Sequence, residues 1–539
     1  AHMNSKTSTK RRHFLKLGAS VPVLGLMGAC GSDNTTPPAI AGTPSPTNPT
    51  ESPGNPVAPN PVEPPVVIPA SHPPRGVHAS LFSDASTSRG LCWFTDGLDS
   101  PAAEIQWGPV PVGMSMEAAR NAVQNPLPNV TTASTSQTTG LDNQTHKVVV
   151  NGIDPDQPFR YRVGSEMGGW SDVFIIAPTP KANEAWTMVH FGDHGIGELP
   201  QRLTAELMKP RHKHDLLLLA GDLSYANGEQ PIWDVWFDQN QALLATTTTM
   251  AVPGNHENKD SVAANVPLLP FKDYAFNNRF NQPGDVSFFS FDYNRVHFFG
   301  FTAGAFLEDG KILKEMAALE ADLAMAALRR ALGQIDFIVI FQHYTIWTDQ
   351  EGRAPGNPTL IAVEDQILLR YGVDMVLCGH DHVYQRSKPM MLGLANPLGY
   401  VQVMTGTGGQ SIREFEPEIS AWSEKHFVGL GFSKYTISPG KIVSQYFGTP
   451  PISSDDRSRV QHENIESDFE LVDEFEIRPR PLQIAKSFVK PPRTEQELAK
   501  AHDWQRIYAH TLARNCAHEQ TMPKSTLHEY QSIYPNLLG

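Results

Sequence analysis

Five apolar runs in the middle of the chain each end in a short polar loop that contains glycine or histidine. The runs and the loops that follow them are Met188–Phe191 before Gly192-Asp193, Leu216–Ala220 before Gly221-Asp222, Met250–Pro253 before Gly254-Asn255, Phe337–Phe341 before His343, and Met375–Cys378 before Gly379-His380. Short apolar runs bounded by turn residues are typical of buried strands. Helix-like segments separate them, most clearly from Lys311 to Leu332. Strands that alternate with helices predict an α/β layered domain, which we place at residues 181–448.

The loops at these strand ends carry the candidate functional residues. Ligands of α/β sheets bind beyond the carboxyl ends of the strands, and every polar motif falls there. The side chains are Asp193 in G-D-H-G, Asp222 and Tyr225 in G-D-L-S-Y, Asn255 and His256 in G-N-H-E, His343, and His380 and His382 in G-H-D-H. Any one of them alone is explained by a turn, a cap or a structural histidine. Five such loops in one domain instead indicate a metal site.

The types of donor atom indicate which metals. Carboxylate, phenolate, amide oxygen and imidazole suit hard or borderline ions such as Fe, Zn and Mn, whereas a soft site uses cysteine. Seven side chains, Asp193, Asp222, Tyr225, Asn255, His343, His380 and His382, are too many for one ion. They suit two ions with one bridging carboxylate, an arrangement that clamps the attacking and leaving oxygens of an in-line displacement.

The order of these motifs resembles that of the calcineurin-like metallophosphoesterases, and the tyrosine of the second motif resembles that of the purple acid phosphatases. The resemblance covers residues 77 to 448 and implies a four-layer sandwich of two sheets flanked by helices. It implies that Fe(III) is held by Asp193, Tyr225 and His382, and that a second divalent ion (Fe, Zn or Mn) is held by Asn255, His343 and His380. Asp222 would bridge the ions, and Tyr225 would give the iron its charge-transfer colour.

The same resemblance implies an acid phosphatase that acts on phosphorylated small molecules. A metal-bound hydroxide would attack the phosphate monoester, and His256 would be a general acid to the leaving oxygen. Glu257 either orients His256 beside the substrate or makes a loop hydrogen bond. His194 either donates to phosphate or caps its loop, and the cap is favoured. Plant-type members have a histidine pair shortly after the motif of His343, whereas this chain has Tyr344 to Glu351 there.

Two other functions remain open at this stage. A two-metal clamp does not itself dictate a mono- or diester, so a phosphodiesterase or alkaline-type enzyme of the same superfold is one alternative. The other is a surface binding protein with a vestigial metallodomain. The complete donor set argues against it, because a decayed site loses donors.

The start of the chain resembles a bacterial export signal. Ala1-His2 before Met3 are interpreted as a cloning scar, and Arg11-Arg12 precede an apolar stretch from Leu17 to Ala29. That stretch is about thirteen residues long, which is short of the roughly twenty that span a membrane. We therefore expect residues 1–30 to be a twin-arginine signal. Cys30 closes the stretch as L-M-G-A-C, so a lipid anchor and an incidental cysteine both stay open. The protein would be periplasmic, a cell-surface lipoprotein or secreted.

The rest of the chain divides by composition. Residues 31–75 are rich in proline, threonine and serine and are interpreted as an extended linker. Residues 76–180 show about seven short alternating runs, which predict an antiparallel sandwich resembling fibronectin III and the N-terminal domain of plant-type purple acid phosphatases. Tyr161 is a candidate for the corner hydrogen bond of such sandwiches. Residues 449–539 are interpreted as a partly helical tail, with a helix opening at the capping box Thr494–Glu497.

Charge and cysteine content exclude other classes of protein. The net charge is −14, so nucleic-acid binding is not expected, because it needs a positive field to neutralise phosphates. Four cysteines are too few for a disulfide scaffold. The oligomeric state stays open.

Overall fold

The structure is a computed structural model that describes residues 71–121, 126–137, 142–227, 230–258, 280–284, 288–304, 311–449 and 468–480. The predicted export signal, Cys30, nearly all of the predicted linker and the predicted helix after Thr494 lie outside the described residues. Among the helices of the described part, none is both long and apolar enough to cross a membrane.

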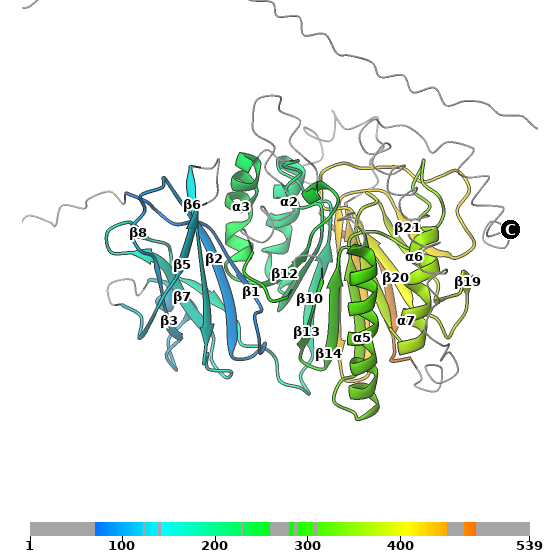
Figure 1. Cartoon of the computed structure of the whole chain (residues 1–539), viewed down its shortest axis with the longest axis horizontal. Coiled ribbons are helices and arrows are strands. Elements are labelled where there is room, and N and C mark those ends of the chain that lie inside the picture. Colours follow the sequence, from blue (N-terminus) through cyan, green and yellow to red (C-terminus); the bar gives the residue numbers. More distant parts are fainter. Residues whose placement is uncertain are drawn as a thin grey trace, which may run out of the picture. The chain divides into compact units, whose positions relative to one another are not determined.

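Two antiparallel sheets make up the N-terminal part (Figure 1). One sheet has the order β1-β2-β6-β5, with bounds Arg75–Ser80, Ser88–Asp96, Asn143–Asn151 and Ser134–Gln137. The other has the order β4-β3-β7-β8, with β9 also on β7 and bounds Asn129–Thr132, Glu104–Pro109, Phe159–Ser165, Gly169–Trp170 and Phe174–Ile176. Alternate residues of both sheets form one buried cluster that includes Val77, Trp93, Ile105 and Val148. The predicted all-β N-terminal sandwich is therefore confirmed, whereas its likeness to fibronectin III stays a prediction. The short helix α1 (Met116–Asn121) was not expected.

The larger part is built on two further sheets. The six-stranded sheet has the order β12-β11-β10-β22-β23-β24, with bounds Thr248–Val252, Leu216–Ala220, Trp186–Phe191, Gly431–Ser438, Lys441–Gly448 and Glu470–Ile477. The seven-stranded sheet has the order β13-β14-β15-β16-β20-β17-β21, with bounds Phe288–Tyr293, Val296–Phe301, Phe337–Gln342, Met375–Cys378, Val401–Thr405, Tyr384–Ser387 and Ser423–Phe427. Strands β10 to β12 are parallel to one another, as are β14, β15, β16 and β20. A small hairpin, β18 (Met390–Met391) with β19 (Leu394–Ala395), stands apart.

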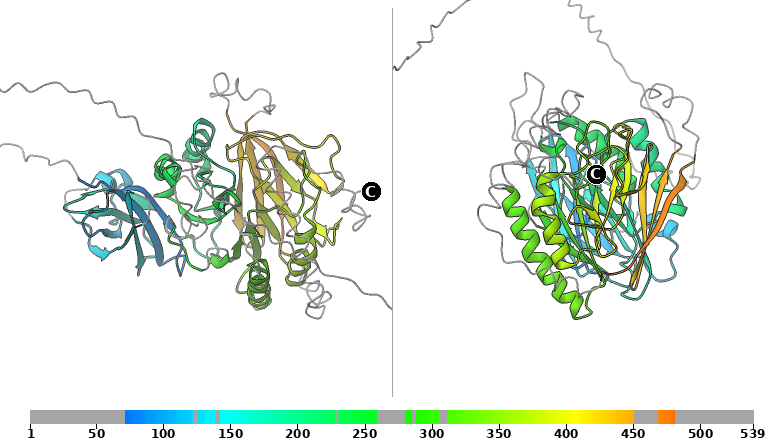
Figure 2. Two further views of the ribbon diagram at one scale, coloured as in Figure 1. Left: turned by 45° about the horizontal axis from the view of Figure 1, so that its top comes forward. Right: turned by 90° about the vertical axis from the view of Figure 1, so that its right-hand side faces the viewer.

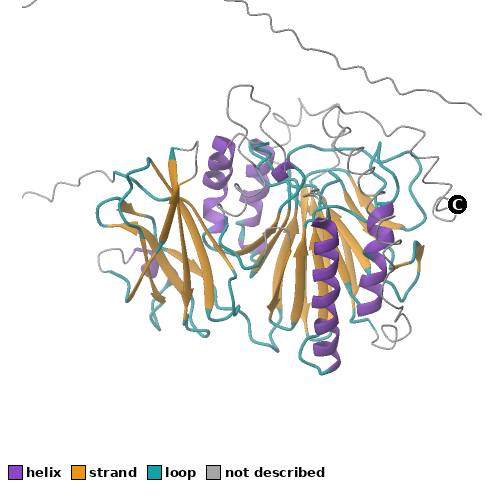
Figure 3. Ribbon diagram, viewed as in Figure 1, coloured by secondary structure: helices purple, strands orange, loops and turns teal. Residues whose placement is uncertain are grey.

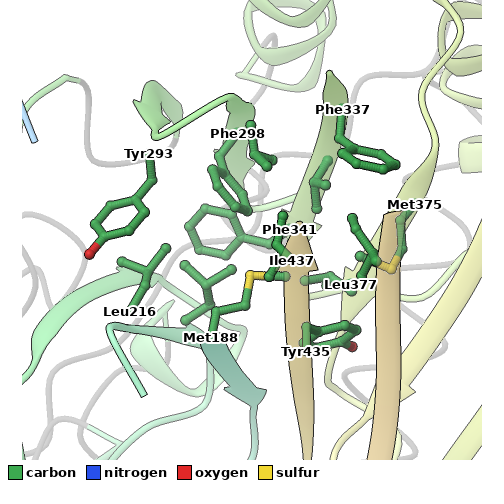
Figure 4. Packing of buried hydrophobic residues seen from close by; sticks show 14 of the residues in the cluster. Met188, Leu216, Tyr293, Phe298, Phe337, Phe341, Met375, Leu377, Tyr435 and Ile437 are labelled. Carbon is green, nitrogen blue, oxygen red and sulfur yellow. The ribbon is translucent and has the colours of Figure 1, made fainter. Parts of the chain in front are cut away.

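Apolar side chains fill the space between the two sheets (Figure 4). Met188, Leu216 and Tyr435 of the six-stranded sheet share one buried cluster with Phe298 and Phe337 of the other sheet. Strands buried on both faces read as continuous apolar runs, which is why these five runs were recognisable in the sequence.

Helices cover the outer faces of both sheets (Figures 2 and 3). Helices α2 (Glu198–Leu207) and α3 (Gln230–Leu244) pack on the six-stranded sheet through a cluster that joins Leu203 and Trp236 to Leu217. Helices α5 (Lys311–Ala331), α6 (Pro358–Val363) and α7 (Asp365–Tyr371) pack on the seven-stranded sheet. One-turn 3₁₀ helices follow α2 at Pro210–His212 and β12 at His256–Asn258. This is the predicted four-layer α/β arrangement.

Strand β24 lies in what the sequence suggested was a tail. It pairs antiparallel with β23 and extends the six-stranded sheet. Its acidic composition concealed it, since glutamate and aspartate are depleted in strands. Asp473 is nevertheless buried, because its carboxylate accepts hydrogen bonds from Tyr384 and Arg386.

Hydrogen bonds join the N-terminal sandwich to the larger part. The hydroxyl of Tyr161 donates to the carbonyl of Ala245, just after α3, at 2.8 Å, so it does not make the expected corner bond within the sandwich. The backbone N–H of Val77 donates to Gln241 of α3 at 2.9 Å. Both bonds lie in buried or partly buried surroundings.

His297 on β14 should make stability depend on pH. Its two ring nitrogens lie 2.8 Å from Asp292 and 2.6 Å from Asp322. Burial lowers the pKa of His297, but hydrogen bonds to the two carboxylates and their charges outweigh it and raise the pKa to about 9. Because folding raises the pKa of His297, protonated His297 stabilises the folded protein fully at a pH below about 6.5, the pKa of an unfolded histidine. This stabilisation is lost as the pH rises through 9.

We therefore expect His297→Gln to lower the free energy of unfolding by up to about 3 kcal/mol at pH 6. The difference from wild type should shrink steadily between about pH 6.5 and 9, the window set by the two pKa values. Urea unfolding of both proteins at pH 6 and pH 10 measures it. An equal difference at both pH values would show that the charge of His297 contributes nothing.

Candidate metal centre

The functional side chains come from loops at the carboxyl ends of β10, β11 and β12 in one sheet and of β15 and β16 in the other. Because each set of strands is parallel, their ends lie at a common edge. The structure brings all seven predicted ligands together there, as two adjacent groups.

The first group consists of Asp193, Tyr225 and His382. The phenol of Tyr225 donates to Asp193 Oδ1 at 3.1 Å, and His382 Nε2 lies 3.0 Å from the same phenol oxygen. His382 Nε2 also lies 3.3 Å from Asp193 Oδ1. Three potential ligand atoms thus converge within ordinary hydrogen-bond distance of one another.

The second group surrounds His343. Its Nε2 lies 3.0 Å from Asn255 Oδ1, 3.2 Å from His380 Nδ1 and 3.4 Å from Asp222 Oδ1. The ligand atoms of Asp222, His343 and His380 all lie within 4.8 Å of one another, and all three residues are buried. The two groups are connected, because the backbone N–H of His380 donates to Asp193 Oδ2 at 2.7 Å.

Hydrogen bonds behind the site orient two of the imidazoles. His343 Nδ1 donates to the carbonyl of Ala220 at 2.7 Å, and His382 Nδ1 is hydrogen-bonded to Ser411 Oγ. Both rings therefore turn Nε2 toward the other donors, the arrangement that metal-binding histidines ordinarily show. The backbone N–H of His382 also donates to Gln350 Oε1 at 2.6 Å.

The charged residues of the second group shift one another's pKa values. Burial disfavours the ionised form of Asp222, but His343 and His256 hold the pKa of its carboxyl far below the ordinary value. Burial lowers the pKa of His343, but Asp222 raises it to about 9. Because a histidine binds a metal through a deprotonated nitrogen, a cation bound by His343 would displace this proton.

The pKa of Tyr225 is raised, whereas that of Asp222 is lowered. Burial, reinforced by the charge of Asp193, raises the pKa of the Tyr225 phenol well above its ordinary value. The phenol therefore keeps its proton unless a cation replaces it. Oxygen and imidazole donors that converge in this way suit hard or borderline ions.

The backbone of four of the predicted ligands is unusual. Asp193, Asp222, Tyr225 and His380 all have positive φ, at 59°, 51°, 56° and 72°. Such conformations are uncommon for residues other than glycine and cluster at functional sites. Of the neighbouring glycines, Gly221 also has positive φ, at 81°, and Gly379 allows close approach, since a Cβ there would lie 2.6 Å from Asp193 Oδ2.

His256 borders both groups. Its Nε2 lies 3.8 Å from Asp222 Oδ2, and its ring leans on that of Tyr225 with 4.2 Å between the centroids. Its Nδ1 lies 2.6 Å from Asn227 Oδ1. The side chain is 14% exposed, so a ligand can reach it from solvent.

Two other predicted residues are engaged elsewhere. Glu257 accepts hydrogen bonds from the backbone N–H groups of Asp222, Leu223 and Gly254, at 2.7 to 2.9 Å. It therefore ties two ligand loops together, and this geometry favours the loop bond over the orientation of substrate or of His256.

His194 has no ring nitrogen directed at the site. Its Nδ1 accepts from the indole N–H of Trp236 at 3.1 Å, and its Nε2 lies 3.1 Å from the carbonyl of Pro200. Burial lowers its pKa to about 4, so the ring is neutral. The favoured interpretation as a structural group agrees with this geometry, and a phosphate contact does not.

Sequence reasoning missed Asn227, Gln350 and Ser411. Asn227 is two positions beyond Tyr225 and Ser411 follows the glycine loop 405–409, so proximity to motifs was the available signal. Of the segment from Tyr344 to Glu351, which follows His343, Tyr344 lies beside the site, with its ring centroid 4.5 Å from that of His380.

Comparisons with known proteins find relatives of both the larger α/β part and the N-terminal sandwich. Residues 187–384 match the family model described as calcineurin-like phosphoesterase, and residues 74–176 match that of the purple acid phosphatase N-terminal domain. Purple acid phosphatase 18 of Arabidopsis thaliana is 25% identical over 370 residues, 66% of this chain and 78% of its own length. Purple acid phosphatase 21 of the same plant is 28% identical over 270 residues, 49% and 58% of the two chains. The Fe(3+)-Zn(2+) purple acid phosphatase 12 of that plant is 25% identical over 310 residues, 52% and 64%.

Solved structures share the fold. The purple acid phosphatase PPD1 from yellow lupin (Lupinus luteus) seeds has a TM-score of 0.63 at 19% identity and covers 79% of this chain and 78% of its own. PhoD has a TM-score of 0.51 at 11% identity over 80% and 98% of the two chains. Residues 187–384 are therefore a calcineurin-like phosphoesterase domain, and residues 74–176 are the N-terminal domain found in purple acid phosphatases.

Proposed function

We propose that the chain is a dinuclear-metal acid phosphatase that hydrolyses phosphate monoesters. The observation that carries the proposal is the pair of adjacent donor groups, in which seven oxygen- and nitrogen-bearing side chains from five loops converge. Seven donor side chains are too many for one ion, whereas two ions with a shared carboxylate account for all of them.

The donor types support the assignment of the ions that the family resemblance implies. Fe(III) is the harder ion and suits the group with the phenol, Asp193, Tyr225 and His382, whereas a divalent ion (Fe, Zn or Mn) suits Asn255, His343 and His380. Asp222 would bridge. When bound, two cations supply positive charge that acidifies water and neutralises the phosphoryl group. Because Fe(III) carries the higher charge, we expect an acidic pH optimum.

Residues of the chain then supply binding and proton transfer. His256 lies beside Asp222 and is partly exposed, so it can meet the ester oxygen of a phosphate held at the site. Its Nε2 faces the donors and can deliver a proton to the departing alcohol. Such proton transfer contributes typically about 10²–10⁴ in rate.

Elemental analysis and a visible spectrum of the protein, matured with excess transition ions, test the proposal. We expect two cations per chain and a visible charge-transfer band, with turnover of p-nitrophenyl phosphate greatest at acidic pH. Faster turnover of bis(p-nitrophenyl) phosphate than of the monoester would instead indicate a phosphodiesterase. A protein that binds no pair of cations would refute the enzyme altogether.

Tyr225→Phe is the matched variant for the spectrum. It removes the phenol oxygen and keeps the ring that leans on His256. The visible band should disappear while the second cation is retained. Colour that survives in this variant would contradict the assignment of Fe(III) to the group of Tyr225.

We further propose that the protein is exported by the twin-arginine route, on the basis of Arg11 and Arg12 before the apolar stretch from Leu17 to Ala29. A reporter fused after residue 75 should leave the cytoplasm, and the double change Arg11→Lys and Arg12→Lys should retain it. Equal export of both fusions would refute the route. If the wild-type protein partitions into detergent and the Cys30→Ala variant does not, Cys30 carries a lipid anchor.

A further inference from the structure

Asn227 lies directly behind His256, in a conformation that suits asparagine. Its Oδ1 is 2.6 Å from His256 Nδ1, and its backbone has φ of 49°. Asparagine adopts left-handed φ more readily than other residues with a Cβ, because its short side chain bonds locally. The turn after Tyr225 thus directs an amide oxygen at the imidazole.

This contact determines which ring nitrogen carries a proton. An amide oxygen only accepts hydrogen bonds, so His256 Nδ1 must be the donor. The neutral ring then has its lone pair on Nε2, and the cationic ring has its exchangeable proton there. Nε2 is the nitrogen that lies 3.8 Å from Asp222 Oδ2, on the side of the metal ligands.

Other contacts restrict the ring without choosing its tautomer. The backbone N–H of His256 donates to Asp222 Oδ1 at 2.7 Å, which anchors the residue to the centre. The ring of Tyr225, tilted by 45°, limits its swing on one side. Asn227 adds a directional bond to Nδ1, which aims Nε2.

We propose that Asn227 is a positioning residue that keeps His256 Nε2 as the proton-transfer atom; this inference rests on the proposed phosphatase function. Water adds to phosphorus and the ester P–O bond breaks. The electron pair of that bond goes to the leaving oxygen, and the proton on Nε2 neutralises it. The imidazole ends neutral, with its Nδ1–H still donated to Asn227.

Two substitutions at this position separate the amide oxygen from the backbone. Asn227→Gly removes the acceptor and tolerates positive φ, whereas Asn227→Asp keeps an acceptor and also tolerates that φ. Asn294→Gly is the matched control, because Asn294 has φ of 56° in a turn before β14, where it bonds the carbonyls of Pro180 and Lys181.

The measurement compares two substrates whose leaving groups differ in basicity. Phenol is more basic than p-nitrophenol and depends more on a proton from His256. We expect Asn227→Gly to lower kcat about 10–100-fold on phenyl phosphate, the usual effect of removing such a supporting group, and clearly less on p-nitrophenyl phosphate. Metal content, the visible band and KM for both substrates should change little, and Asn227→Asp should restore most of kcat.

Several results would overturn the inference. They are equal losses on both substrates, a loss no greater than that of Asn294→Gly, a loss of cations in Asn227→Gly, or no restoration by Asn227→Asp. Failure of the proposed function is a separate result, since then wild type itself hydrolyses neither ester. A wild type that turns over both esters, beside an Asn227→Gly protein that matches it, would refute only the role of Asn227.

Discussion

Asp222→Ala protein should lose at least about a thousandfold in kcat/KM toward p-nitrophenyl phosphate. Charge stabilisation by a metal contributes several kcal/mol, and each 1.36 kcal/mol is tenfold in rate, so loss of the ions has an effect of this size. Asp222 lies 3.4 Å from His343 in one donor group, and its charge helps to raise the pKa of Tyr225 in the other, so its removal affects both groups at once. Cation stoichiometry should fall together with activity.

The same strand provides the control for this variant. Asp215 directly precedes β11, at the end opposite to Asp222, and accepts a hydrogen bond from the backbone of Thr187. Asp215→Ala should alter stability but leave cation content and turnover near those of wild type. Full activity in Asp222→Ala would be inconsistent with a catalytic metal centre and would favour a binding protein.

His256→Ala should have the second largest effect, a fall in kcat of about 10²–10⁴ with a much smaller change in KM. A proton donor acts in the transition state, whereas the residues that would hold the cations also support binding of the ground-state phosphate. The deficit should be greater on phenyl phosphate than on p-nitrophenyl phosphate. Two cations and the visible band should remain, because the side chain of His256 is outside both donor groups.

A double variant shows whether Asn227 acts through His256. If it does, Asn227→Gly adds nothing to the loss caused by His256→Ala, since residues in one network are not additive. His72, in the N-terminal part, is the unrelated histidine for comparison, and His72→Ala should leave kcat unchanged. Additive losses in the double variant would mean that Asn227 affects turnover by another path.

The fold was predictable where burial gives a strong pattern. Strands such as Leu216–Ala220 are covered on both faces, so their apolar runs stand out in the sequence. Strand β24 does not, because its carboxylates alternate with apolar residues and Asp473 is buried by partners distant in the chain. The hydrogen bond of Tyr161 to Ala245 likewise depends on how two parts of the chain pack.

The candidate metal ligands stood out in the sequence for a different reason. All of them except His343 sit in short motifs that contain glycine, and only the whole set distinguishes a metal centre from ordinary turns. The residues that hydrogen-bond to these candidate ligands lie in no comparable sequence motif. Ser411 is hydrogen-bonded to the ring of His382, which is 29 positions away in the sequence. The sequence motif around Glu257 is the same whether its carboxylate contacts substrate or backbone. Those roles follow from distances in three dimensions.

The left-handed backbone at four of the candidate ligands has a practical consequence for protein engineering. Glycine is the residue that relaxes such a conformation, so exchanging Asp193 or His380 for glycine should remove local strain. A directed-evolution campaign that rewards heat resistance alone would therefore drift toward glycine at these positions. Its most robust clones would be colourless and inert, so any such selection must include a turnover step in every round.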